Sequence, residues 1–289
     1  MSQPITAKMV AELRARTGAG MMDCKAALEE AQGDMDRAVE ILRKKGIAKA
    51  DKRGDRSASQ GLVVIEASPS GREAAMIELN CETDFVARNE DFIVLARELG
   101  KHALQQAPDG VHPGSAIEGQ AFRGKTVGEI VKEVSGKVGE AMSLKRVARF
   151  RTDAGTVGHY LHHNAQSGAM VELEGTRGEP VTALARELAL HVTSTDPLGV
   201  SEADIPADLL ARERRIAEEQ VVQEGKPEKI REKIVEGKLR KFVAERTLLG
   251  QAFVKDDSRT VSDLVKETAK QVGGSVTVKR LVRFKVGES

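Results

Sequence analysis

The chain has 289 residues and carries 45 lysines and arginines against 44 aspartates and glutamates, a formal net charge of +1. This length allows two or more domains with their own cores, and a nearly neutral chain lacks the global field that attracts nucleic acid or anionic membranes. One tyrosine, seven phenylalanines and no tryptophan offer few rings on which unpaired bases could stack. Direct nucleic-acid binding is therefore not expected.

Two cysteines, Cys24 and Cys81, lie far apart and lack the CxxC spacing of a metal or redox site. This usage is typical of a reducing compartment. The N-terminal residues do not form a basic and apolar leader, and no apolar run approaches the roughly 20 residues that span a bilayer. We therefore expect a cytoplasmic protein without a membrane segment.

Residues 5–46 show the apolar spacing of three short helices. Gly18 follows the first helix, Gly33 ends the second, and Asp34 is a suitable N-cap for the third. The pattern predicts a compact three-helix module over residues 1–48. So small a module has a thin core.

Met21 and Met22 begin the second of these helices, where they are equally compatible with core packing and with adaptable contact to a partner. The next stretch, residues 49–60, contains no large apolar side chain. A segment that cannot bury apolar surface is predicted to be a linker.

Two strand-like runs, residues 61–67 and 74–81, flank a Ser-Pro-Ser-Gly turn and predict a β-hairpin. A helix with Phe92 on its apolar face follows, then a loop rich in proline and glycine, a second helix and a final strand over residues 143–151. The order is strand, strand, helix, helix, strand.

A polar segment separates the hairpin from the first of these helices. It places a hydroxyl, a carboxylate and a large ring side by side at Thr83, Asp84 and Phe85, just before Asn89, a suitable N-cap. Phe85 lies seven residues before Phe92. This spacing leaves two possibilities open, a ring in the helix core or a ring exposed for contact.

The same order of elements returns in the second half of the chain. The matched ranges are 75–79 with 169–173, 95–99 with 184–188, and 125–150 with 259–284, at offsets of 94, 89 and 134. We therefore predict an α+β protein with two repeated core subdomains and antiparallel sheets. The first subdomain covers residues 61–152, and the second covers residues 153–203 and 250–289.

The changes in offset locate the differences between the copies. The fall from 94 to 89 gives the first copy five additional residues between Leu79 and Leu95, in the segment that contains Thr83, Asp84 and Phe85. Because the sister copy folds without them, the shared fold does not require this extension. The comparison favours an exposed Phe85 more than the segment does by itself.

The rise from 89 to 134 gives the second copy an insertion of 45 residues. Two charged amphipathic runs, broken at Gly225-Lys226-Pro227, predict an antiparallel helical hairpin over residues 204–249. Its charged face is either solvated or an arm for self-association or partner contact.

Three histidines, His159, His162 and His163, form the most metal-like cluster. On a strand, His159 and His163 share one face and His162 lies on the other, so the three do not converge on one ion. We expect them at an exposed hairpin tip. The sequence also lacks GxxxxGK[ST], GxGxxG, GxSxG and HExxH, so neither an enzyme activity nor a cofactor is expected.

Two long motifs carry a family resemblance. They read LRARTGAGMMDCK over residues 13–25 and ELNCETDFVARN over residues 78–89. In this order they closely resemble the two signatures of the bacterial elongation factor Ts family, and the similarity covers essentially the whole chain. The resemblance implies an N-terminal ubiquitin-associated-like module, two core subdomains and a coiled-coil hairpin inserted in the second.

The resemblance also implies a function, guanine-nucleotide exchange on elongation factor Tu, the translational GTPase that delivers aminoacyl-tRNA. Both the GDP-bound and the nucleotide-free GTPase are implied partners. In the family, an Asp-Phe tip intrudes into the GTPase and disturbs its Mg²⁺ site, while the head module and a Tyr-x-His hairpin make further contacts. By matching motif, the residues that displace Mg²⁺ are Thr83, Asp84, Phe85 and Val86, and the other contact residues are Arg14, Met21, Met22, Tyr160 and His162.

Two other functions remain open. The head module by itself is compatible with a non-catalytic adaptor for ubiquitin-like partners. Lys279, Arg280 and Arg283 form a basic group that is compatible with RNA binding. The helical hairpin is in addition a candidate surface for a homodimer.

Overall fold

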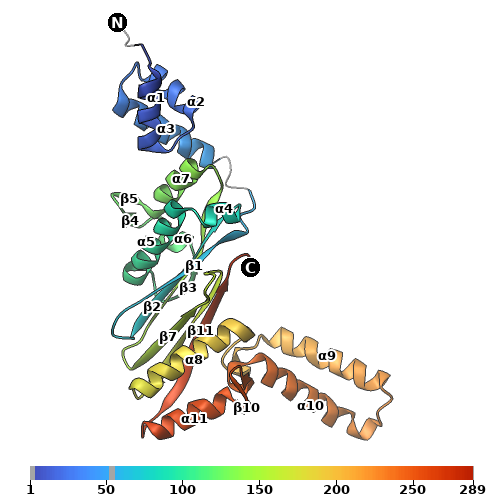
Figure 1. Cartoon of the computed structure of the whole chain (residues 1–289). Coiled ribbons are helices and arrows are strands. Elements are labelled where there is room, and N and C mark those ends of the chain that lie inside the picture. Colours follow the sequence, from blue (N-terminus) through green and yellow to red (C-terminus); the bar gives the residue numbers. More distant parts are fainter. Residues whose placement is uncertain (1–3, 52–55, 289) are drawn as a thin grey trace. The chain divides into compact units, whose positions relative to one another are not determined.

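The computed structural model describes residues 4–51 and 56–288, the side chains of 47–51 excepted. The chain divides into two compact units. Their helices and strands are labelled in Figure 1. The first comprises the described residues within 4–64, 77–148 and 285–288, and the second comprises residues 65–76 and 149–284.

The first unit begins with the three predicted helices, α1 (Ala7–Thr17), α2 (Met21–Glu30) and α3 (Met35–Asp51). Helix α1 starts where the Thr6 side chain accepts the Met9 N–H, and it ends at Gly18 in the left-handed conformation, with φ 68°. A small apolar core holds the module together. It is formed by Leu13, Cys24, Ala27, Leu28, Ala31, Ala38 and Leu42.

Helix α3 continues to Asp51, three residues into the predicted linker. Residues 52–55 of that linker lie outside the described part of the chain. Before this point α3 packs on α7 (Val127–Val138), with Gly46 of α3 against Gly136 of α7. An ion pair between Arg43 and Glu133 joins the same two helices.

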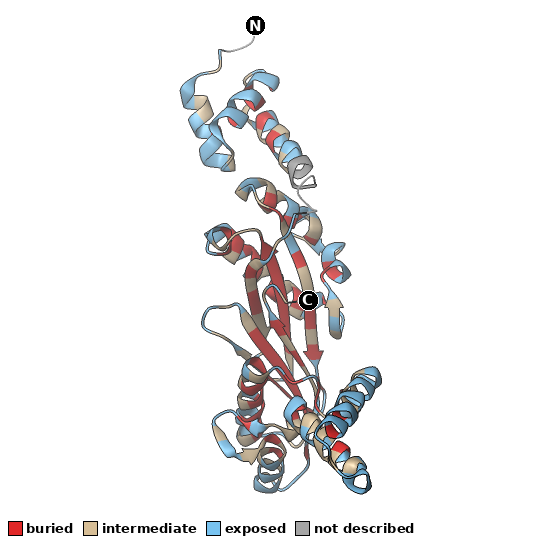
Figure 2. Ribbon diagram, turned by 90° about the vertical axis from the view of Figure 1, so that its right-hand side faces the viewer, coloured by how far each residue is buried: buried red, intermediate tan, exposed pale blue. Residues whose placement is uncertain are grey.

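A four-stranded sheet has the order β1-β2-β6-β3, formed by β1 (Gln60–Ala67), β2 (Glu73–Cys81), β6 (Met142–Arg151) and β3 (Gly110–Pro113). The predicted hairpin is thus confirmed as β1 and β2. Buried residues gather along the strands (Figure 2).

Helix α5 (Glu90–Gln106) buries Phe92, Leu95 and Leu99, as its apolar spacing predicts. The segment predicted as an irregular loop after it contains strand β3 and the short helix α6 (Ser115–Glu118). A two-stranded sheet of β4 (Ala121–Phe122) and β5 (Lys125–Thr126) then leads into α7.

The second unit repeats this plan. Strands β11 (Val276–Lys285), β8 (Ser167–Gly175) and β7 (Gly155–Leu161) form a sheet in that order, and β7 pairs antiparallel with β8. Helices α8 (Glu179–Thr195) and α11 (Val261–Gln271) contribute to its core. The connections include the short elements η1 (Glu202–Asp204), η2 (Leu248–Gly250), β9 (Ala252–Phe253) and β10 (Asp256–Thr260).

One buried ion pair occurs in both copies. Glu78 is fully buried and accepts a 2.6 Å hydrogen bond from Arg146 Nε; Glu172 is fully buried and accepts a 2.6 Å bond from Arg280 Nε. These residues correspond at the offsets of 94 and 134 found in the sequence. A buried carboxylate needs such a partner because burial penalises an uncompensated charge. The shared pair therefore belongs to the duplicated fold.

The predicted insertion is confirmed as a helical hairpin of α9 (Ala207–Gln223) and α10 (Glu228–Arg246). The turn between them contains Gly225 at φ 66°, a conformation that favours glycine. The hairpin has a small core of its own, formed by Ala217, Val221 and Val235. In the described part of the chain, no helix is long and apolar enough to cross a membrane.

Candidate functional site

The extension that distinguishes the two copies folds as a single helical turn, α4 (Asp84–Ala87), between β2 and α5. In the second copy β8 ends at Gly175 and α8 begins at Glu179, so the described residues there contain no counterpart of this turn. The prediction that the extension lies outside the shared fold is confirmed.

Phe85 projects from α4 with 83% of its surface exposed. Among the described residues it is the most exposed large apolar side chain, which confirms the exposed interpretation and excludes the core one. Aromatic rings are usually well covered in a folded protein, so an exposed ring on an added turn makes Phe85 a candidate contact residue.

The neighbours of Phe85 face different environments. Asp84 is about half exposed and forms a 3.2 Å ion pair with Arg88 one turn later. Val86, which the motif places among the contact residues, is only 9% exposed and packs inward together with Ala87. The turn therefore presents Phe85 and Asp84 outward while Val86 and Ala87 anchor it.

Thr83 is the N-cap of α4, and its side chain accepts the Val86 N–H at 3.4 Å. Its backbone N–H and hydroxyl both donate to the carboxylate of Glu140, at 3.0 and 2.6 Å. Its carbonyl accepts the Cys81 thiol proton at 3.2 Å. Burial, followed by the nearby Glu140 charge, raises the pKa of the Cys81 thiol to about 12.

The head module carries the other predicted contact residues of the first unit. Met21 and Met22 are 57% and 75% exposed at the start of α2, and Arg14 is exposed on α1. Exposed methionines at a helix start, outside the small core of the module, are suited to adaptable apolar contact.

Tyr160 and His162 belong to the second unit. Tyr160 is half-buried on β7, and His162 lies in the following turn, where its Nδ1 is 2.9 Å from Asn164 Oδ1. Burial, with a smaller effect of the Arg186 charge, lowers the pKa of His159. The described residues contain no cluster of three His, Cys, Asp or Glu side chains that could hold a metal ion.

The basic group that is compatible with RNA binding is engaged within the protein. Lys279 pairs with Glu172 and Glu174, and Arg280 pairs with Glu172. Arg283 is 12% exposed and pairs with Asp196. Phosphate recognition needs accessible cations. These contacts favour a structural role for the group.

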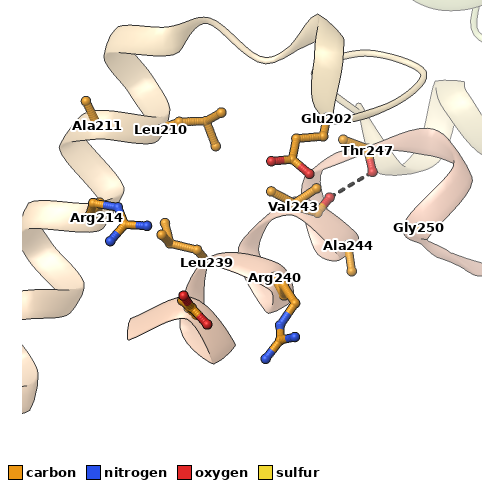
Figure 3. A pocket seen from close by; sticks show the side chains of 11 residues that line it. Glu202, Leu210, Ala211, Arg214, Leu239, Arg240, Val243, Ala244, Thr247 and Gly250 are labelled. Atoms are coloured by element: carbon orange, nitrogen blue, oxygen red, sulfur yellow. Dashed lines mark hydrogen bonds between the residues drawn. The ribbon is translucent and has the colours of Figure 1, made fainter. Parts of the chain in front are cut away.

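A cleft of about 710 Å³ lies within the second unit, between α9, α10 and the segments that connect them to its sheet (Figure 3). Leu210 of α9 and Leu239 and Val243 of α10 line its apolar part. Arg214 at its edge is hydrogen-bonded to Glu232 at 2.9 Å, so its charge is already paired. The cleft holds no group of catalytic residues that resembles a known mechanism.

The sequence predictions name the exposed residues of the turn but miss Glu82 and Glu140. Glu82 accepts the Ala141 N–H at 2.7 Å, and Glu140 holds Thr83. A signal for Glu140 is present in the repeat, because the matching position in the second copy is Gly274. A charged side chain at a position where the other copy has glycine is not required by the shared fold.

Comparison with known proteins identifies the family. The family model for elongation factor TS matches residues 82–288. The chain is 41% identical to elongation factor Ts of Chlorobium phaeobacteroides over 288 residues, 99% of this chain and 100% of that protein. It is 43% identical to the proteins of the same name from Alkalilimnicola ehrlichii, covering 98% and 92% of the two chains, and from Clostridium perfringens, covering 98% and 93%. The chain therefore belongs to the elongation factor Ts family of translation elongation factors.

Proposed function

We propose that this protein is the guanine-nucleotide exchange factor of elongation factor Tu, which it binds in the GDP-bound and nucleotide-free states. The observation that carries the proposal is Phe85, an 83% exposed ring on a turn that the duplicated fold does not require. The protein acts by binding and makes no covalent intermediate. Its site of action is the cytoplasm, where translation takes place.

The tip formed by Thr83, Asp84, Phe85 and Val86 displaces Mg²⁺ from the GTPase. Phe85 enters the partner as an apolar wedge, and Asp84 brings a carboxylate towards the groups that surround the metal. Thr83 caps the turn and buried Val86 anchors it. Arg14, Met21 and Met22 on the head module, and Tyr160 and His162 on the second unit, make the remaining contacts.

The energetics follow from linkage. A factor that binds the nucleotide-free GTPase more tightly than the GDP form weakens GDP binding by the same ratio. A hundredfold effect requires about 2.7 kcal/mol of differential contact energy, because each tenfold change corresponds to about 1.4 kcal/mol. Burying one large apolar side chain contributes roughly 1.5 to 3 kcal/mol. Phe85, which is free to be buried in a partner, can supply this amount.

A second partner is a second copy of the chain. We propose self-association through the hairpin α9–α10, which exposes Ile216, Val222 and Ile230 at 37%, 55% and 44%. Apolar side chains on a projecting charged arm support contact with another surface.

The exchange function is tested with Phe85→Ala. We expect slower release of a fluorescent GDP from elongation factor Tu in stopped-flow measurements, by up to about a hundredfold if the ring supplies the energy of a fully buried side chain. Because Phe85 is exposed, the unfolding midpoint should stay at that of the unmodified protein.

Val111→Ala is the matched control, since Val111 is a 51% exposed apolar residue on β3 of the same unit. It should leave GDP release unchanged. If Phe85→Ala released GDP as fast as the unmodified protein, the wedge role would be refuted.

A further inference from the structure

The carboxylate of Glu140 holds the base of the turn that carries Phe85. It accepts two hydrogen bonds from one residue, the backbone N–H of Thr83 at 3.0 Å and the Thr83 hydroxyl at 2.6 Å. Hydrogen bonds to an ionised acceptor are short and stronger than neutral ones, and a bidentate pair also fixes orientation. Glu140 therefore constrains both the position and the rotation of the N-cap of α4.

Glu140 is itself placed by the end of α7. Gly139 follows this helix in the left-handed conformation at φ 85° and donates its N–H to the Ser135 carbonyl at 2.9 Å. The Ser135 hydroxyl donates to the carbonyl of Glu140 at 2.5 Å. The carboxylate thus projects from a backbone that is fixed on both sides.

A second carboxylate makes the reciprocal link. Glu82 precedes Thr83 and accepts the N–H of Ala141, the residue after Glu140, at 2.7 Å. The pair Glu82-Thr83 and the pair Glu140-Ala141 are therefore linked twice, because each pair donates a backbone N–H to a carboxylate of the other. This carboxylate clamp, defined as Glu82 and Glu140 with their bonds to Ala141 and Thr83, connects the turn to the end of α7.

The sister copy shows that the duplicated fold does not need this clamp. At the offsets of the repeat, Glu140 corresponds to Gly274 and Glu82 to Thr176. There the segments meet directly, because the Thr176 N–H donates to the carbonyl of Ser275 at 2.7 Å. A Cβ on Gly274 would lie only 1.9 Å from Thr176 Oγ1, so a side chain in the place of Glu140 would require the Thr176 side chain to move. The clamp and the added turn occur together in the first copy.

We propose that Glu140 is the positioning residue of the exchange site, which keeps the Phe85 turn in the orientation that enters the partner. This assignment rests on the proposed exchange function. Glu140 acts through Thr83 and α4 without touching the GTPase. Without the Glu140 carboxylate the protein still has the Phe85 ring, but the α4 turn that carries the ring is mobile. Part of the contact energy is then spent on ordering this turn during binding.

The first test measures the mobility of the turn without any partner. The chain contains no tryptophan. Phe85→Trp therefore introduces the only tryptophan of the chain, at the tip. When it is excited at a wavelength that Tyr160 does not absorb, its time-resolved anisotropy reports local motion on the nanosecond scale. Adding Glu140→Ala should lower the slowly decaying part of the anisotropy, whereas Glu118→Ala, which removes an exposed carboxylate at the end of α6, should not.

Glu140→Gln is the conservative variant. Its amide keeps one acceptor for the two Thr83 donors, so the anisotropy should fall to an intermediate value. This variant also guards against misfolding, because it preserves the shape of the side chain. An anisotropy that is the same with Glu140→Ala as without it overturns the proposal, whatever the exchange measurements give.

The second test asks whether Glu140 acts through Phe85. At saturating factor, Glu140→Ala should slow GDP release by roughly tenfold, about 1.4 kcal/mol of the barrier. In a double-mutant cycle, the same change should have no further effect in a Phe85→Ala background. An equal slowing in both backgrounds would show that Glu140 acts independently of the ring and overturns its positioning role.

The two tests separate the clamp from the exchange function. A loosened tip together with non-additive slowing supports the proposal. If Phe85→Ala has no effect on GDP release, the wedge fails, while the anisotropy still decides whether Glu140 orders the turn. If Phe85→Ala slows release but Glu140→Ala changes neither rate nor mobility, the wedge stands and the clamp is refuted.

Discussion

Two glycines at the crossing of α3 and α7 give the sharpest stability prediction. A Cβ added to Gly136 would lie 2.8 Å from the carbonyl carbon of Gly46 and 2.9 Å from its oxygen, closer than real Cβ atoms approach. The obstructing atoms are backbone, so they cannot rotate away. A Cβ added to Gly46 would meet Gly136 only at 3.7 Å, an ordinary contact. Gly136→Ala must therefore force the helices apart, whereas Gly46→Ala fits.

The expected magnitudes follow from two opposing effects. Replacing glycine by alanine inside a helix stabilises it by about 0.8 to 1 kcal/mol. Overpacking a close contact costs about 1 to 3 kcal/mol. Gly136→Ala should therefore be neutral or destabilising, by up to about 2 kcal/mol. Gly237→Ala in α10 should stabilise by about 1 kcal/mol, because no atom lies within 4 Å of its added Cβ.

Equilibrium unfolding in urea measures these differences, and amide hydrogen exchange in α3 shows whether the head module separates first. We expect Gly136→Ala to accelerate exchange in α3 and Gly46→Ala to leave it unchanged. The module carries Arg14, Met21 and Met22, so a loosened head should also raise the factor concentration needed for half-maximal GDP release. If Gly136→Ala stabilised the protein as much as Gly237→Ala, the close helix contact would be refuted.

Two further predictions concern Cys81 and the hairpin. Because the pKa of the Cys81 thiol is raised from 9.0 to about 12, its contribution to stability is complete below pH 9 and is lost as the pH rises towards 12. Over this window the unfolding free energy should fall by up to about 1.4 kcal/mol per pH unit more steeply than in Cys81→Ala; equal slopes would contradict it. Replacing residues 207–245 by a short glycine linker should abolish self-association, because it removes the exposed Ile216, Val222 and Ile230. The 2.8 Å hydrogen bond from the Leu198 N–H to the Arg246 carbonyl lies outside the replaced segment and is retained. A native mass that still corresponds to a dimer of the shortened chain would exclude the hairpin as the dimer surface.

Local patterns in the sequence predict the elements of the fold well. Asn89 is the N-cap of α5 and accepts the Asp91 N–H at 2.9 Å, and Asp34 accepts the Arg37 N–H at 2.9 Å at the start of α3. These signals are reliable because capping joins residues two or three positions apart. Comparison of the two copies adds the exposed position of Phe85, which its own segment leaves open.

The structure differs from the predictions in segments whose composition argues against burial. Such a composition does not prevent a helix or a strand from forming. The start of the predicted linker has no large apolar side chain, yet α3 continues to Asp51. Lysine and alanine are strong helix formers, so helix propensity can extend a helix through residues that have no large apolar side chain. Strand β3 has only four residues within a segment rich in proline and glycine, and its place in the sheet comes from pairing with β6. Such long-range pairing has no local signal.

The candidate site depends even more on long-range contacts. Thr83 and Glu140 are 57 positions apart, and no periodicity links them. The motif identifies the tip because tip residues are adjacent in sequence, whereas the carboxylate that is hydrogen-bonded to Thr83 comes from the segment just after α7. Within the sequence, Glu140 is distinguished only by the duplication, because the corresponding position in the second copy is Gly274.

Comparison of the two copies distinguishes features that both share, which the fold requires, from features that only one copy has. Glu78 with Arg146 and Glu172 with Arg280 form the same buried ion pair, so this pair satisfies a need common to both sheets. The α4 turn and Glu140 occur in one copy, and the hairpin α9–α10 occurs in the other. Each copy has thus kept the shared core and gained a different exposed element. Because the other copy folds without the α4 turn or without the hairpin, substitutions of exposed residues in these elements should change binding far more than the free energy of unfolding. The ratio of these two changes distinguishes a partner-contact residue from a structural one.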